Sequence, residues 1–187
     1  MNITTLTLNK SNIKDFAFER NELLKKSKTE WNLFLDNDEK IQNDEFILTC
    51  SEIESYIISR KNYFLDQYVG EDRIIRLVKR GTGKFVRAVH EIWKPDNIKN
   101  VGKINNNYII HNTANNLKDY INKINKYSTL HAKENNKEKK KVNLSKIIFY
   151  PTFKFIVELI KSKNIVFSII QSFHSFLAWS KIYLKSY

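Results

Sequence analysis

The chain has 187 residues, 42% hydrophobic and 13% aromatic, which is enough for one ordinary domain with a core and an appendage. Four Gly and two Pro exclude a collagen-like or linker-dominated architecture, and the single cysteine, Cys50, excludes an internal disulfide and fits a reducing compartment. The net charge of +12 is concentrated in residues 132–187, whose 11 lysines and 3 glutamates give +8, so an anionic surface of lipid or nucleic acid is expected as a partner.

The N-terminal residues lack the apolar segment of a secretory signal. The first predicted element is a helix over residues 12–29, which Asn12 can cap and whose apolar stripe includes Leu23. The short, bounded apolar run 31–35 predicts a buried strand. A second helix is expected over about 44–54.

Residues 55–90 are rich in β-branched and aromatic side chains and predict strands, with a turn at "RGTG" (80–83). Another short strand is expected over 103–111, and a helix over 116–131. Because strand and helix signals are interleaved, we expect an α/β body with a mixed sheet.

A charge-rich linker is expected over 132–145, followed by a basic, aromatic segment over 146–187 that predicts amphipathic helices. No run of 18 or more apolar residues predicts a spanning helix. The segment can lie on anionic lipid or pack on the preceding domain, and the sequence leaves both open. The side chains suited to lipid headgroups are Trp179, Tyr183, Tyr187, Lys154, Lys161, Lys163, Lys181 and Lys185.

Acidic residues follow the buried run 31–35 directly. Ligands of α/β sheets bind at the carboxyl ends of strands, where Asp36 and Asp38 would project. Such a pair can hold a divalent cation against a diphosphate, but this stretch alone favours a solvated strand end. A calcium-binding EF-hand is excluded, because the sixth position of its loop would be Ile41 instead of Gly.

Two further residues have chemistry that fits a site. Glu91 in "VHE" (89–91) can act as a general base or be an ordinary surface acid, and Lys94 rules out a zinc-protease motif there. His111, at the end of an apolar strand, is a candidate metal ligand or a structural histidine. The chain has no phosphate-binding loop and no nucleic-acid module signature.

The order of these segments resembles family 2 glycosyltransferases, in particular the branch of lipopolysaccharide-core glucosyltransferases. The resemblance covers about residue 5 to residue 187. Those proteins have an Arg-Asn helix, a strand ending in an Asp-x-Asp-Glu box, an Arg-Leu-x-x-Arg strand, a His-Glu pair, a later strand ending in His, and a basic aromatic helix pair. The matching segments are "FERN" (18–21), "WNLFLDNDE" (31–39), "RIIRLVKRGTGKFVRAVHE" (73–91), "YIIHNT" (108–113), "YINKINKYSTLHAKE" (120–134) and the C-terminal tail.

The resemblance implies a role for each matching residue. Asp38 would ligate manganese or magnesium, with His111 approaching the metal and the diphosphate. Asp36 would lie near the nucleotide ribose or a metal-bound water, and Arg20 would support the nucleotide pocket. Glu91 would be the catalytic base of a single inverting displacement, in which an acceptor hydroxyl attacks a nucleotide-diphosphate sugar.

The resemblance also implies an incomplete GT-A fold, Rossmann-like with a mixed sheet, over residues 1–131. The first βαβ unit of such enzymes has no counterpart in this sequence, so a truncated form is expected. A glycan or lipopolysaccharide-core acceptor and a peripheral position on the cytoplasmic face of the cell membrane are implied too. The alternative is a non-catalytic basic remnant that binds membrane surfaces or, less in keeping with the sequence, nucleic acid.

Overall fold

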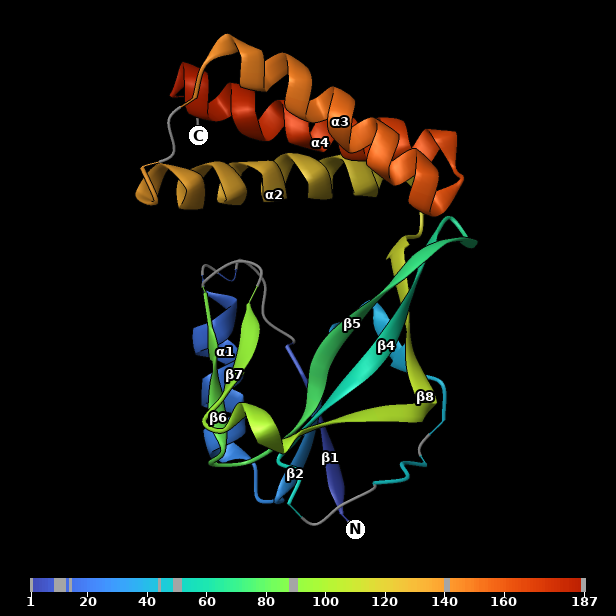
Figure 1. The fold of residues 1–187 in the computed structure, drawn as a ribbon, viewed down its shortest axis with the longest axis vertical. Coiled ribbons are helices and arrows are strands. Elements are labelled where there is room, and N and C mark those ends of the chain that lie inside the picture. Colours follow the sequence, from blue (N-terminus) through green and yellow to red (C-terminus); the bar gives the residue numbers. More distant parts are fainter. Residues whose placement is uncertain are drawn as a thin grey trace. The chain divides into compact units, whose positions relative to one another are not determined.

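A computed structural model describes residues 2–8, 13, 15–43, 45–48, 52–87, 91–139 and 142–185. The chain forms two compact units (Figure 1). Unit 1 consists of Met1–Asn62 and Glu71–His111, and unit 2 of Tyr63–Gly70 and Asn112–Tyr187. Four residues with sequence-based expectations lie outside the described residues, namely Asn12, Cys50, His90 and Tyr187.

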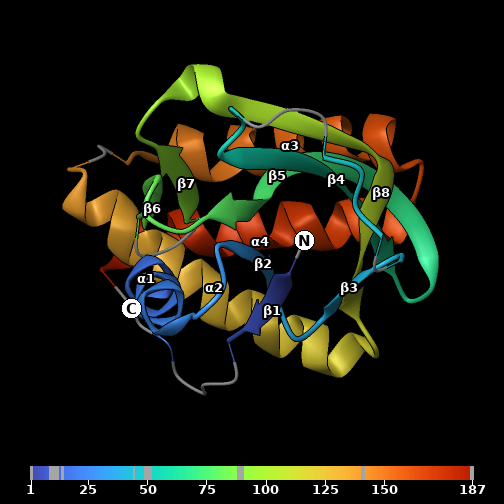
Figure 2. The same cartoon turned by 90° about the horizontal axis from the view of Figure 1, so that it is seen from below.

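The described residues form one six-stranded sheet and one two-stranded sheet. The larger has the order β1-β2-β5-β4-β8-β3, which places β1 and β3 at its edges (Figure 2). Because β1 runs parallel to β2 and β2 antiparallel to β5, the sheet is mixed, as predicted. The strands are β1 (Ile3–Thr7), β2 (Trp31–Leu35), β3 (Glu39–Ile41), β4 (Ser55–Phe64), β5 (Gln67–Lys79), β6 (Gly83–Val86), β7 (Ile92–Pro95) and β8 (Val101–Ala114).

Strand β2 is the centre of unit 1, and its predicted burial is confirmed along all five residues. Successive side chains of a strand point to opposite faces. Leu33 therefore belongs to one apolar cluster, with Tyr56 of β4, while Phe34 belongs to another, formed with helix α1 (Phe16–Lys26) and the β6–β7 hairpin. This double burial fixes where β2 ends and thus where its acidic residues emerge.

The structure differs from expectation at three places near the N-terminus of unit 1. Ile3–Thr7, for which no strand was predicted, forms β1. Helix α1 is shorter than 12–29 and is capped by Asp15, whose side chain accepts from the backbone N–H of Phe18 at 2.9 Å. The helix expected over 44–54 is wrong for the described residues 45–48 and 52–54, which are non-helical.

Asn107 gives the physical reason for the missing helix. Its side-chain amide donates to the backbone carbonyls of Asn43, at 2.7 Å, and Glu45, at 3.0 Å. These bonds hold the segment alongside β8, while Phe46 and Leu48 pack against the core cluster. A pairing between residues more than 60 positions apart outweighs local helical preference.

Unit 2 contains three long helices, α2 (Leu117–Lys137), α3 (Leu144–Ser162) and α4 (Ile165–Leu184), and α4 packs on both α2 and α3. Helix α2 continues to Lys137, through much of the expected linker, because Ser128, Ala132 and Asn135 extend its buried face. The remaining short helix is a 3₁₀ turn in unit 1, Ile98–Asn100. Among the described residues, no helix combines the length and hydrophobicity needed to cross a bilayer.

Candidate functional site

Three of the five sequence-predicted site residues meet in one ionic cluster of unit 1. Arg20 of α1 donates to Asp36, at 2.6 Å, and to Glu91, at 2.9 Å. Asp36 stands at the end of β2 and Glu91 directly before β7. Three elements separated by up to 71 positions in sequence therefore bring a cation and two carboxylates together.

Arg20 is fully buried, with 0% of its side chain exposed. Its guanidinium lies 5.6 Å from the ring centroid of Phe34 and 5.5 Å from that of Phe85. Burial, followed by the nearby charge of Arg76, lowers the pKa of Arg20, and the carboxylates of Asp36 and Glu91 oppose that shift. A buried cation is stable only with such partners, so this arginine fixes the positions of both acids.

The acidic segment is a hydrogen-bonded turn. The backbone N–H of Glu39 donates to the carbonyl of Asp36 at 2.9 Å, and the backbone N–H of Asp36 donates to Oε2 of Glu39 at 3.0 Å. Asp and Asn favour such turns. The turn directs Asp36 toward Arg20, while Asp38 lies beside His111, with 3.6 Å between Oδ2 and Nε2. The two interpretations of the acidic segment, a polar turn and part of a ligand site, are therefore compatible.

A hydrogen bond at its second ring nitrogen, Nδ1, orients the His111 side chain. Nδ1 lies 2.7 Å from the side-chain oxygen of Asn62, to which it donates, and Nε2 faces Asp38. Across β3 and β8, His111 is paired in register with Glu39, which connects this pair to the ionic cluster.

The donor atoms of Asp38 and His111 suit a divalent cation that takes its other ligands from water and a substrate diphosphate, as Mg²⁺ commonly does. The described residues contain no group of three or more His, Cys, Asp or Glu side chains that could hold a metal by themselves. These two residues therefore fit a shared cation site but not a closed protein cage.

Two arginines of the cluster were not among the predicted site residues, although Arg76 lies in the Arg-Leu-x-x-Arg strand of the resemblance. Arg76 of β5 binds Asp36 at 2.9 Å and Glu39 at 3.3 Å, and lies 3.6 Å from Glu91. Arg60 of β4 binds Glu39 at 2.7 Å. An arginine within an apolar strand is a usable signal, since a charge there needs a partner, but it does not identify the partner.

Arg60 also binds Asp72 through two parallel hydrogen bonds, at 2.9 and 2.6 Å. Burial by itself lowers the pKa of Arg60, but the hydrogen bonds that Arg60 donates to Asp72 and Glu39 outweigh it and raise that pKa above its ordinary value. The cluster is thus extended, and each of its arginines binds at least two carboxylates.

One comparison with known proteins bears on this geometry. The chain is 27% identical over 156 residues to the lipopolysaccharide core biosynthesis glycosyltransferase LpsC of Rhizobium meliloti (strain 1021), with 76% of this chain and 57% of that protein covered. The chain thus spans little more than half the length of this relative. No protein-family model matches the chain. The chain is therefore distantly similar to a glycosyltransferase, and its mixed α/β fold is compatible with that class.

Proposed function

We propose that unit 1 is a glycosyltransferase domain of the family 2, GT-A type, which transfers a sugar from a nucleotide-diphosphate sugar to a cell-surface glycan such as a lipopolysaccharide core. The observation that carries the proposal is the convergence of Arg20, Asp36 and Glu91, with Asp38 and His111 on the adjoining turn and strand. The similarity to LpsC supports the same class of reaction.

In the proposed reaction, Glu91 accepts the proton of the acceptor hydroxyl. Arg20 and Arg76 both face Oε1 of this carboxylate, and among the described residues no hydrogen bond to Oε2 is found. The arginines therefore orient one oxygen and leave the other for an incoming hydroxyl. That hydroxyl displaces the diphosphate from the anomeric carbon in one inverting step.

Asp38 and His111 are the proposed ligands of a manganese or magnesium ion, with Asp36 close to the ribose or a metal-bound water. When bound, the cation would neutralise charge on the departing diphosphate. Nδ1 of His111, held by Asn62, keeps Nε2 available as a ligand atom. Arg20 holds Asp36 in place beside this site.

The first test is nucleotide binding by an Asp38→Ala variant. The wild-type chain is expected to bind one of the common nucleoside diphosphates only with Mn²⁺ or Mg²⁺, and the variant at least about tenfold more weakly, because a cation ligand is lost. Calorimetric titration of a panel of uridine, guanosine, adenosine and cytidine diphosphates measures both.

Asp96→Ala is the matched control, since Asp96 is an exposed acid of unit 1 outside the ionic cluster. Its nucleotide affinity should equal that of the wild type. Cation-independent nucleotide binding that survives Asp38→Ala would contradict the metal assignment.

We further propose that α3 and α4 lie on the cytoplasmic surface of the cell membrane. Both helices expose one apolar face: Ile148, Phe149, Phe153, Ile156 and Ile160 on α3, and Ile165, Ile169, Phe173 and Phe176 on α4. Soluble surfaces rarely leave so many large apolar side chains in water. The exposed lysines Lys161, Lys163 and Lys185 match anionic headgroups, which favours lipid over another protein.

Three of the side chains expected at the lipid are engaged within unit 2 instead, the first being Lys154, which pairs with Glu158 at 2.7 Å. Lys181 donates to α2 through the backbone carbonyl and side chain of Asn125, at 2.8 and 2.7 Å, and through Ser128, at 2.7 Å. Trp179 packs on Tyr150, with ring centroids 5.0 Å apart. The expectation that Lys181 meets lipid is therefore wrong, and we infer that apolar contact contributes more than charge.

The double variant Phe149→Ser/Phe153→Ser is expected to lower the partition coefficient onto phosphatidylcholine–phosphatidylglycerol vesicles by about tenfold or more, because each phenylalanine removed takes apolar area from the contact. Both rings are more than two-thirds exposed, at 67% and 69%, so folding should not suffer. Vesicle co-sedimentation across a salt series measures the effect.

Phe18→Ser serves as the control, because Phe18 is 58% exposed but belongs to α1 in unit 1. Apolar binding should persist at high salt, whereas binding through lysines alone would be lost. Equal vesicle binding by the wild type and the double variant would refute this surface.

A further inference from the structure

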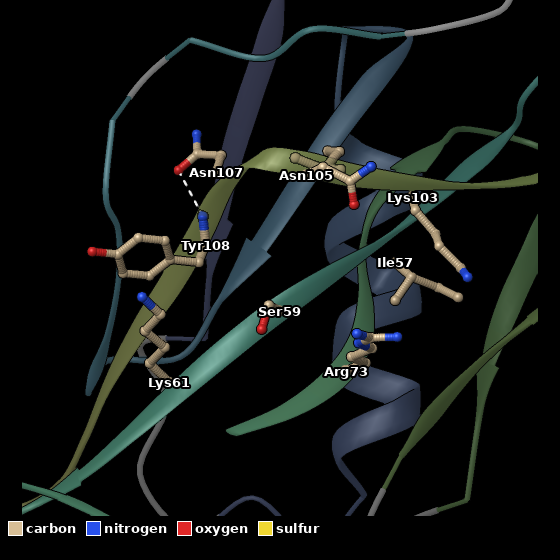
Figure 3. A pocket seen from close by; sticks show the side chains of 9 residues that line it. Ile57, Ser59, Lys61, Arg73, Lys103, Asn105, Asn107 and Tyr108 are labelled. Atoms are coloured by element: carbon tan, nitrogen blue, oxygen red, sulfur yellow. Dashed lines mark hydrogen bonds between the residues drawn. The ribbon is translucent and has the colours of Figure 1, made fainter. Parts of the chain in front are cut away.

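We propose that unit 1 has a second binding site, a basic hollow on β4, β5 and β8 that takes a phosphate-bearing sugar. The hollow has a volume of about 490 Å³, within the range of pockets that hold small molecules. Its lining includes the cations Lys61, Arg73 and Lys103. Figure 3 shows Arg73 and Lys103 at one end and Lys61 beside Tyr108 at the other.

The three cations of the hollow have no counterion in the described part of the chain. Within residues 2–8, 13, 15–43, 45–48, 52–87, 91–139 and 142–185, no carboxylate pairs with Lys61, Arg73 or Lys103, and no acidic residue lines the hollow. The basic residues of the ionic cluster, in contrast, each bind at least two carboxylates. Gathering like charges in a concavity costs free energy, which an anionic ligand would offset.

The hollow is separate from the ionic cluster, although the same strands build both. Neighbouring residues of a strand face opposite sides of the sheet. On β4, Arg60 binds Glu39 of the cluster, whereas Lys61 lines the hollow. On β5, Asp72 binds Arg60, whereas Arg73 lines the hollow. The hollow is therefore independent of the proposed nucleotide site, so a negative test of one proposal leaves the other unaffected.

The neutral residues of the hollow point to a sugar attached to the anion. Ser59 and Asn105 supply a hydroxyl and an amide group, which donate to and accept from sugar hydroxyls. Asn107 uses its amide N–H groups on the 43–45 segment and its oxygen on the backbone N–H of Tyr108, at 2.9 Å, so it is held rigidly. Three cations in one compact hollow match one or two phosphate groups.

Nucleic acid fits the hollow less well. Base stacking needs exposed aromatic faces, and Tyr108 is the aromatic residue of the lining. The ammonium group of Lys61 lies 3.7 Å from its ring centroid and covers one face. The described residues thus offer a phosphate cluster with hydroxyl-binding groups in place of a stacking platform.

The test is ligand titration of the full chain by heteronuclear NMR. Glucose 6-phosphate is the main probe, with inorganic phosphate, glucose and a single-stranded oligonucleotide as the other arms. We expect glucose 6-phosphate to shift the amide signals of residues 57–61 and 103–108 and to bind more tightly than inorganic phosphate, and glucose not to bind. Arg73→Gln and Lys103→Gln should each weaken binding about tenfold, as expected for a lost charged hydrogen bond.

Lys84→Gln is the matched control, because Lys84 is an exposed cation of β6 in the same unit. Unchanged affinity in this variant supports the site, and equal weakening by all three substitutions overturns it. Tighter binding of the oligonucleotide through the same residues would assign the hollow to nucleic acid instead. If vesicles of phosphatidylglycerol shift the amide signals of residues 57–61 and Arg73→Gln abolishes this effect, the phosphate belongs to a lipid headgroup. If only the soluble sugar phosphate shifts these signals, the phosphate belongs to a free ligand.

Discussion

Replacing Arg20 with methionine is expected to lower the free energy of unfolding of unit 1 by about 3 kcal/mol or more, the usual cost of breaking a buried ion pair. Among the described residues, the substitution leaves Glu91, whose side chain is 13% exposed, with the more distant Arg76 as its cationic neighbour. Asp36 contributes less to the loss, because its side chain is 32% exposed and water screens its charge. Urea unfolding followed by the fluorescence of the buried Trp31 and Trp93 reports on unit 1.

A control on the same helix separates burial from charge. Lys25 pairs with Glu22 at 2.6 Å, but its side chain is 72% exposed, so Lys25→Met should change the free energy of unfolding by about 0.5 kcal/mol at most. The double variant Arg20→Met/Glu91→Gln should be less destabilised than the sum of its single changes, because the orphaned charge is gone. Equal, small effects of Arg20→Met and Lys25→Met would show that the buried pair does not hold the cluster together.

The second large effect is expected for Glu91→Gln, which should lower the rate of sugar transfer about 10²- to 10⁴-fold, the contribution of a positioned base. Glutamine has nearly the same shape and can still accept a hydrogen bond from Arg20, so the side chain should keep its place. The loss should appear in kcat, with KM for the donor little changed. Transfer is measured with the nucleotide sugar identified by the binding panel.

Glu71→Gln provides the comparison, since Glu71 is an exposed acid of β5 outside the cluster. Its transfer rate should match that of the wild type. Wild-type transfer by Glu91→Gln would exclude Glu91 as the base, and a loss of activity that parallels a loss of stability would assign it a structural role only.

Hydrophobic patterns predicted much of the local structure. The buried strand Trp31–Leu35, the turn at residues 80–83 and two C-terminal helices are confirmed. The last helix exposes large apolar residues, among them Val166, Ile169, Phe173 and Phe176. Such features depend on neighbours in sequence, which is why pattern alone reveals them.

Errors occurred where distant residues decide the conformation. The segment around Phe46 looked helical, yet the amide of Asn107 holds the chain there alongside β8. The helix α2 passed through a segment of high charge because a buried face continues to Asn135. In both cases a tertiary contact outweighs local composition.

The candidate site likewise combines features that local sequence predicts with features that depend on tertiary contacts. By itself, the sequence determined that Asp36 and Asp38 follow a buried strand and identified Arg20, Glu91 and His111 as candidate site residues, because residue type and order are local information. Only the tertiary structure decided that Arg20 joins Asp36 to Glu91 and that Arg76 and Glu39 complete the cluster. The physical reason is that a buried charge needs a partner, but pairing across 16 to 71 residues depends on how strands and helix are brought together.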